Sequence, residues 1–219
     1  MRALVVGASG GIGAALCAAL ARRGDVVGLS RQVDGFDVTD EVAVVRGLER
    51  LEPGFDLVIV ATGALVLAGR GPEKSLRALE PATMAAQFAL NAVGPALVLK
   101  HALRLLPKER EVRFAALSAR VGSIGDNALG GWYSYRAAKA ALNQVIHTAA
   151  IEVARSHRQS IVVALHPGTV ATGFAAGHGA GHASVAPDEA AGNLLTVLDG
   201  MTPAHTGGFF DWAGKRIPW

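Results

Sequence analysis

The chain has 219 residues, of which 51% are hydrophobic and 18% are charged, and its formal net charge is +3. A chain of this length and apolar content can bury one sizeable core, which excludes an intrinsically disordered protein. No run of Lys and Arg is longer than Arg22-Arg23, so the sequence lacks the basic stripe typical of proteins that bind nucleic acid.

The single cysteine, Cys17, excludes an intrachain disulfide and lies in an apolar helix pattern typical of a core position. The N-terminal apolar run, Ala3–Val6, is too short for the core of a signal peptide and reaches Gly7 at once. The longest apolar runs are also expected to be too short to cross a bilayer. We therefore expect a cytoplasmic protein with no membrane partner.

Short apolar runs alternate along the chain with longer amphipathic stretches. The short runs are aliphatic and β-branched with little polar alternation, which is typical of strands covered on both faces. In chain order they are Ala3–Val6, Val26–Leu29, Leu57–Ala61, Val112–Leu117, Ile161–Leu165 and Gly208–Trp212. Helical periodicity marks Ile12–Arg23, Asp40–Leu51, Thr83–Leu106, Tyr133–His157 and Pro187–Asp199. The alternation predicts an α/β chain with a single-domain Rossmann fold over residues 1–219, a doubly wound parallel β-sheet with helices on both faces.

The segment Phe174–Val185 is the least structured part of the pattern, with glycines at every second position from 177 to 181. We expect a substrate loop at about residues 174–187, beside the site. His178 and His182 are four residues apart and could share a metal ion on a helix. The glycines argue against a helix and no third ligand is evident, so no metal site is predicted.

A glycine-rich segment, Gly7-Ala8-Ser9-Gly10-Gly11-Ile12-Gly13, joins the first predicted strand to the first predicted helix. Backbone N–H groups at a helix start attract an anionic pyrophosphate, and glycine lets the backbone approach it closely. This placement predicts a dinucleotide site. Its candidate residues are Gly7, Ser9, Gly10, Gly11, Ile12 and Gly13.

The spacing Gly-x-x-x-Gly-x-Gly resembles the fingerprint of the short-chain dehydrogenase/reductase family, and the resemblance covers nearly the whole chain. It implies an adenine contact at Asp37-Val38-Thr39, through Asp37 and Val38. Ala61-Thr62-Gly63-Ala64 stands where the family often has Asn-Asn-Ala-Gly. Ala61 therefore occupies the position of the first Asn, whose role has no counterpart at this position. Pro167-Gly168-Thr169-Val170-Ala171-Thr172 resembles the segment beside the nicotinamide carboxamide. The implied cofactor residues are Ala61, Thr62, Gly63, Pro167, Gly168, Val170 and Thr172.

The residues at the end of the second predicted strand indicate which nicotinamide cofactor is preferred. Enzymes that use NAD commonly hold the ribose hydroxyls with an acid at this place. Here Ser30 is followed by Arg31, whose guanidinium can bind a 2′-phosphate bidentately. We expect NADP(H) as the preferred cofactor, with NAD(H) as the alternative, and Ser30 and Arg31 as contacts.

The strongest catalytic signal is Tyr135-Arg136-Ala137-Ala138-Lys139 inside a helical stretch. Residues four apart share a helix face, so the phenol lies beside the ammonium, and a nearby cation favours tyrosinate. Tyr135 can then act as the general acid in reduction and the general base in oxidation. By resemblance, Lys139 also holds the nicotinamide ribose. Tyr133 is six residues from Lys139 and on another face.

Two further candidates come from the resemblance. Asn91 falls where the family keeps an asparagine in a long helix, which implies a water between Lys139 and bulk solvent. The family usually presents Ser-Ser after the fifth strand, and the second serine bonds the substrate oxygen. Here Ala119 occupies that position, so Ser118 or Ser123 would have to replace it; Ser118 is nearer.

The stretch from Ser118 to Asn143 and the C-terminal end from Phe209 are most similar to sniffer-type carbonyl reductases and bacterial C-signal-like proteins. The resemblance implies an NADPH-preferring oxidoreductase that acts on a small-molecule carbonyl or alcohol. The alternative is a non-enzymatic cofactor-sensing or signalling Rossmann protein. No nucleic-acid partner is expected, and helices that are apolar nearly all round predict a homodimer or homotetramer. Most residues of the segments expected to line the pocket (Ala64–Leu79, Gly122–Trp132 and Phe174–Val185) are small or apolar, which favours a modestly sized, uncharged substrate.

Overall fold

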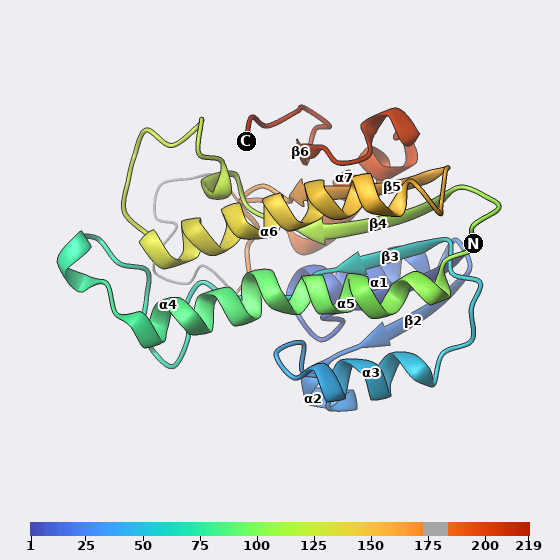
Figure 1. Cartoon of the computed structure of the whole chain (residues 1–219), viewed down its shortest axis with the longest axis horizontal. Coiled ribbons are helices and arrows are strands. Elements are labelled where there is room, and N and C mark those ends of the chain that lie inside the picture. The colour runs from blue at the N-terminus through green and yellow to red at the C-terminus, as the bar shows by residue number, and fades with distance from the viewer. Residues whose placement is uncertain (173–183) are drawn as a thin grey trace.

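The computed structural model describes residues 1–172 and 184–219, and a six-stranded parallel sheet forms its centre (Figure 1). The strand order is β2-β1-β3-β4-β5-β6, and every neighbouring pair is parallel. The strands are β1 (Arg2–Val6), β2 (Asp25–Leu29), β3 (Leu57–Val60), β4 (Val112–Leu117), β5 (Ser160–His166) and β6 (Phe209–Asp211). Each one was predicted to within two residues at either end.

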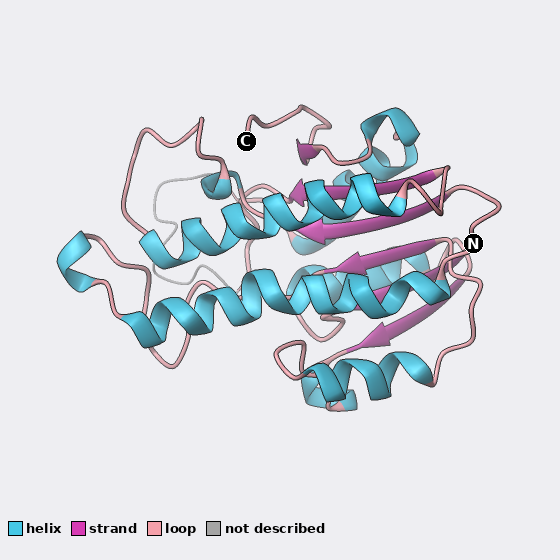
Figure 2. Ribbon diagram, viewed as in Figure 1, coloured by secondary structure: helices cyan, strands magenta, loops and turns pink. Residues whose placement is uncertain are grey.

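Helices cover both faces of this sheet (Figure 2). One face carries α3 (Glu41–Glu49), α5 (Gly94–Ala102) and α6 (Tyr133–Val153), and the other carries α1 (Gly11–Leu20) and α7 (Pro187–Asp199). The remaining helices are α2 (Arg31–Asp34) and α4 (Pro81–Phe88), with short turns at Leu76–Ala78, Leu103–Leu105, Arg120–Gly122 and Pro203–His205. The predicted doubly wound α/β sheet is confirmed.

Two apolar cores lie on either side of the sheet because successive side chains of a strand point to opposite faces. In β1, Leu4 and Val6 pack with α3, α5 and α6, whereas Ala3 and Val5 pack with α1 and α7. Both sets are completely buried, which explains why the strands read as unbroken apolar runs in the sequence.

The predicted helix Thr83–Leu106 is a composite of α4, a π turn at Ala89–Val93 and α5. The joined run Pro81–Leu105 is, by length and composition alone, enough to cross a membrane. The expectation that every apolar run is too short for this is therefore wrong. In the structure the run packs against α3, α6 and the sheet.

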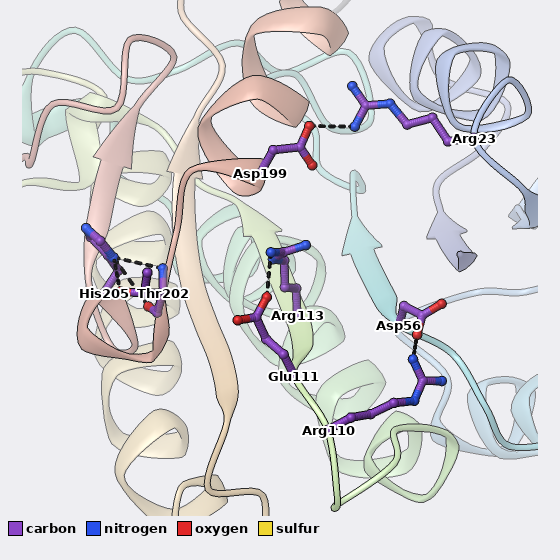
Figure 3. A network of polar contacts seen from close by, with 8 residues as sticks. All are labelled: Arg23, Asp56, Arg110, Glu111, Arg113, Asp199, Thr202 and His205. Atoms are coloured by element: carbon purple, nitrogen blue, oxygen red, sulfur yellow. Dashed lines mark hydrogen bonds and ion pairs between the residues drawn. The ribbon is translucent and has the colours of Figure 1, made fainter.

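Ion pairs gather at the amino end of the sheet, away from the carboxyl ends of the strands (Figure 3). Arg23 lies 2.7 Å from Asp199, Arg110 pairs with Asp56, and Arg113 pairs with Glu111. Most of these side chains are partly exposed, and pairs of this kind contribute about 0–1 kcal/mol each. The buried cores, not these pairs, therefore dominate the stability of the sheet.

Gly13 marks the closest approach of α1 to the turn after β1, and its replacement is expected to destabilise the fold. A Cβ at Gly13 would lie 2.1 Å from the carbonyl oxygen of Gly7. Because backbone atoms cannot move away cheaply, Gly13→Ala should lower the free energy of unfolding by about 1–3 kcal/mol or more, measured in urea. The control is Gly192→Ala in α7, where no atom lies within 4 Å of the added Cβ; it should stabilise by about 0.5–1 kcal/mol. Equal unfolding midpoints for the two variants would contradict this packing argument.

Candidate active site

A cleft of about 830 Å³ opens at the carboxyl ends of β1, β3, β4 and β5, where open α/β sheets bind their ligands. The glycine turn before α1 forms one wall, and the first turns of α6 form another. The predicted residues that line the cleft are Gly10, Gly11, Ile12, Gly13, Ala61, Thr62, Gly63, Ser118, Tyr135, Lys139, Pro167, Gly168, Val170 and Thr172. Gly7, Ser9, Ser30, Arg31, Asp37, Val38 and Asn91 lie outside this lining.

The glycine turn holds the start of α1 against the cleft. Gly7 has φ +91°, and a Cβ there would lie 2.9 Å from the backbone of Ala61, so the turns after β1 and β3 are in close contact. Gly10 precedes α1 without a side-chain cap. The first N–H groups of α1 therefore remain as donors for an anion at the cleft wall.

Tyr135 and Lys139 are both buried on the face of α6 that meets the cleft. The Lys139 Nζ lies 5.8 Å from the centre of the Tyr135 ring and donates to the Leu117 carbonyl at 2.8 Å. Burial lowers the pKa of Lys139 to about 7 and raises the pKa of Tyr135 above its ordinary value. For Tyr135, burial thus outweighs the cation, in contrast to the expectation from the sequence. The phenol is protonated at neutral pH.

The chain enters α6 through three consecutive left-handed residues, Gly130 and Gly131 (both φ +64°) and Trp132 (φ +55°). A non-glycine residue with positive φ is uncommon and is held by its surroundings. The Trp132 N–H donates to the Glu73 carbonyl at 2.6 Å, and its ring meets the Tyr135 ring edge-on with centroids 6.3 Å apart. Trp132 therefore forms a cleft wall beside the tyrosine.

The buried carboxylate of Glu73 caps α6, accepting hydrogen bonds from the Ser134 N–H and hydroxyl. An acid at a helix N-terminus is favoured by the helix dipole. Both Trp132 and Glu73 fall in segments that the sequence analysis expected to line the pocket, and Trp132 does line the cleft, but the contacts that they make at the start of α6 were not predicted. The Gly130-Gly131 pair was the available signal for the turn, but nothing in the sequence pairs Glu73 with a helix 60 residues away.

Asn91 sits in the π turn between α4 and α5 and is completely buried. Its Oδ1 accepts from the Ala64 N–H at 3.2 Å, and its Nδ2 donates to the Ala64 carbonyl at 3.1 Å and to Gln87 Oε1 at 2.6 Å. The side chain therefore fixes the turn after β3 against the cleft. The implied contact with water near Lys139 stays a prediction.

The two serine candidates make different contacts. Ser118 lines the cleft, but its hydroxyl donates to Asn143 Oδ1 at 2.6 Å. Asn143 Nδ2 donates to the Gly122 carbonyl, which fixes the orientation of the amide. Ser123 lies outside the cleft lining and donates to the Pro218 carbonyl at 2.6 Å. Ala119, in the position of the family's serine, does line the cleft.

The candidate adenine-end residues lie on α2 and in the turn that follows it. Ser30 caps α2, and its N–H and hydroxyl both donate to Asp34, an acid that sequence reasoning missed. Asp37 accepts two hydrogen bonds from Thr39, which lower its pKa, with a further contribution from Arg31. Arg31 is exposed, and Val38 is buried.

No cluster of three or more His, Cys, Asp or Glu side chains suited to a metal ion occurs in residues 1–172 or 184–219. His178, His182 and most of the expected substrate loop lie outside the described residues.

One family model and two relatives by sequence bear on this site. The family model described as "Enoyl-(Acyl carrier protein) reductase" matches residues 28–196. A 1-hydroxy-2-glutathionyl-2-methyl-3-butene dehydrogenase of Rhodococcus sp. is 30% identical over 233 residues, which cover 99% of this chain and 98% of the relative. C-signal of Myxococcus xanthus is 38% identical over 138 residues, which cover 63% of this chain and 80% of the relative.

Solved structures agree with these matches. A short-chain dehydrogenase/reductase from Burkholderia multivorans with bound NADP has a TM-score of 0.83 at 25% identity, over 100% of this chain and 99% of its own. The carbonyl reductase Sniffer of D. melanogaster has the same fold, with a TM-score of 0.84 at 20% identity and the same coverage. The resemblance to C-signal-like proteins is therefore confirmed by sequence, and the resemblance to sniffer-type carbonyl reductases is confirmed in the fold. Because the family model spans residues 28–196 and the Rhodococcus relative matches almost the whole length, the chain belongs to the short-chain dehydrogenase/reductase family of oxidoreductases.

Proposed function

We propose that the protein is an NADP(H)-dependent oxidoreductase that transfers hydride between nicotinamide and a carbonyl or alcohol, with Tyr135 as the general acid and base. The observation that carries this proposal is the buried pair of Tyr135 and Lys139 at one wall of the cleft, facing the glycine turn before α1. A non-enzymatic cofactor sensor would need the glycine turn and a ribose contact such as Lys139, but not a buried phenol beside that lysine.

The residues of the cleft fit a dinucleotide. The uncapped start of α1 suits a pyrophosphate. Thr62 Oγ1 is buried with no hydrogen-bond partner in the described part of the chain, so a polar ligand group would satisfy it. Gly10–Gly13, Thr62 and the segment from Pro167 to Thr172 would hold the cofactor, which supplies the hydride when bound.

Tyr135 would supply the proton in the reductive direction. Burial keeps its phenol neutral, so a proton is available for the carbonyl oxygen that accepts hydride. The tyrosinate left behind is costly in a buried site, and a protonated Lys139 beside it would offset part of that cost. The Leu117 carbonyl holds the Lys139 Nζ at 2.8 Å, which fixes the lysine at the cleft lining.

Arg31 is expected to select NADPH. The acid nearby, Asp34, is already bound to Ser30, and the similar Burkholderia structure contains NADP. Arg31→Ala should weaken NADPH binding by about 1.5–3 kcal/mol, the range for a charge-assisted hydrogen bond, and barely change NADH binding. Titration of protein fluorescence with each cofactor measures this, with exposed Arg22→Ala as the control. Equal losses for the two cofactors would refute the assignment.

The proposal as a whole is tested by NADPH oxidation against a panel of aldehydes, ketones and quinones. Turnover of at least one carbonyl class, at a rate that depends on protein concentration, is expected. Tight NADPH binding without turnover of any class would favour the sensor alternative.

A homodimer or homotetramer is a further part of this proposal. Two large apolar side chains on the outer helices, Val93 and Ile151, are 49% and 56% exposed, and a second copy would cover them. Light scattering at micromolar concentration should give a mass of at least two chains, and a strictly monomeric mass would contradict this.

A further inference from the structure

The charged side chains that line the cleft are all cationic. They are Arg120, Arg136 and Lys139, and the described lining contains no Asp or Glu. Residues 173–183, which lie outside the described chain, contain no acidic residue in the sequence either. Whether each cation is already neutralised by a neighbour decides what the cleft can bind.

Arg120 is neutralised. Its Nη1 lies 3.0 Å from Asp126 and its Nη2 lies 3.0 Å from Asp211, so two carboxylates hold the guanidinium. The neighbouring His166 adds no charge at neutral pH, because burial, with a contribution from Arg120, lowers its pKa to about 4. This corner of the cleft therefore carries no surplus positive charge.

Lys139 is completely buried and already donates to the Leu117 carbonyl. Burial disfavours its charged form, and its Nζ lies 5.8 Å from the centre of the Tyr135 ring, which assigns it to the proposed reaction. It does not provide a separate binding group.

Arg136 differs from both. Its Nε donates to the Gly131 carbonyl at 3.0 Å and its Nη1 to the Val121 carbonyl at 3.2 Å, and both acceptors are neutral. Within residues 1–172 and 184–219 it forms no ion pair. The two hydrogen bonds hold the guanidinium between the Gly131 and Val121 carbonyls, and its Nη2 forms no hydrogen bond with residues 1–172 or 184–219.

We propose that the substrate carries a carboxylate as well as its reacting carbonyl, and that Arg136 binds this carboxylate. The inference rests on the proposed function, since it names the substrate class of the same cleft. Arg136 directly follows Tyr135 and lines the same cleft, so one small molecule can reach both. A partly buried guanidinium gains more from a carboxylate than an exposed one, because the site is shielded from water.

This inference replaces the uncharged substrate expected from the sequence. None of the three segments used for that expectation contains Arg136. The helical pattern indicated only that Arg136 follows Tyr135 in the same helix. The structure brings Arg136 to the cleft lining, with Trp132 beside it as an apolar wall.

The test uses a matched pair of aldehydes, 4-carboxybenzaldehyde and its methyl ester, methyl 4-formylbenzoate. Both kcat/KM with saturating NADPH and binding to the NADPH complex by calorimetry are measured. The wild type should favour the acid over the ester at least about tenfold. Arg136→Gln should remove this preference and leave the ester within about threefold of wild type. Arg155→Gln, at an exposed site after α6, is the control and should keep the preference.

The possible results separate cleanly. A wild type with no preference for the acid, in turnover or in binding, overturns the proposal. Equal losses for acid and ester in Arg136→Gln overturn it too, because Arg136 would then only brace the turns at Val121 and Gly131; a rise in the KM for NADPH alone would assign it to the cofactor instead. If Arg136→Gln folds poorly, Arg136→Lys is measured instead. Because this variant keeps the charge, it should retain part of the preference for the acid. Selective binding of the acid without turnover of either aldehyde would contradict the proposed reaction but would still support the carboxylate site.

Discussion

Replacing Tyr135 with Phe is expected to lower kcat by about 10³-fold or more, while the affinity for NADPH stays within about threefold of wild type. The substitution removes only the hydroxyl, and the ring remains to pack edge-on against Trp132. Without the phenol, the two other candidate donors in the described part of the cleft are already engaged: Lys139 donates to the Leu117 carbonyl, and Ser118 donates to Asn143. Stopped-flow kinetics of NADPH oxidation on a confirmed substrate measure the chemical step directly.

Tyr133→Phe is the matched control, because Tyr133 is partly exposed and lies on another face of α6. It should leave kcat unchanged. Lys139→Ala should reduce both kcat and cofactor affinity, which distinguishes a shared role from that of Tyr135. A near-normal rate for Tyr135→Phe would show that another group supplies the proton.

The sheet was predictable because its strands are buried on both faces and therefore read as short, unbroken apolar runs. Runs such as Val112–Leu117 and Ile161–Leu165 were recovered almost residue for residue. The glycine-rich segment at the first strand–helix junction indicated one wall of the cleft, since Gly10–Gly13 line it. Tyr135 and Lys139 were predictable from one turn of helix, a local spacing that tertiary structure leaves unchanged.

Features that depend on contacts between distant segments were not predictable. The π turn at Asn91 arises where this side chain bonds to Ala64, in the turn after β3. Glu73 reaches the start of α6 across 60 residues. The helical spacing also placed a cation beside Tyr135 without revealing that both groups are buried, and burial reverses the direction of the tyrosine pKa shift.

The choice of the catalytic serine shows most clearly what the sequence could not predict. The sequence identifies the candidate hydroxyls, but it does not show which hydrogen-bond partners they have. The sequence favours Ser118 as the donor to the substrate oxygen. In the structure its hydroxyl donates to Asn143 Oδ1, and the Asn143 Nδ2 donates to the Gly122 carbonyl, which favours this orientation of the amide. Ser123 lies outside the cleft lining. Its hydroxyl donates to the Pro218 carbonyl and accepts a hydrogen bond from the Asp126 N–H.

A change at Ala119 is therefore expected to have the second largest effect on catalysis. Loss of one donor to a developing oxyanion typically slows an enzyme about 10²–10³-fold, so Ala119→Ser, which adds a hydroxyl at the cleft lining, should raise kcat by about tenfold or more. Ser118→Ala should change kcat by less than about tenfold and lower the free energy of unfolding by about 1–3 kcal/mol, because it leaves the buried Asn143 Oδ1 without its donor. Ser123→Ala serves as the control that should affect stability and not kcat. If Ser118→Ala instead slows the chemical step 10²-fold or more, then the Ser118 hydroxyl must exchange Asn143 for the substrate during reaction, and the donor expected from the sequence is the one that acts.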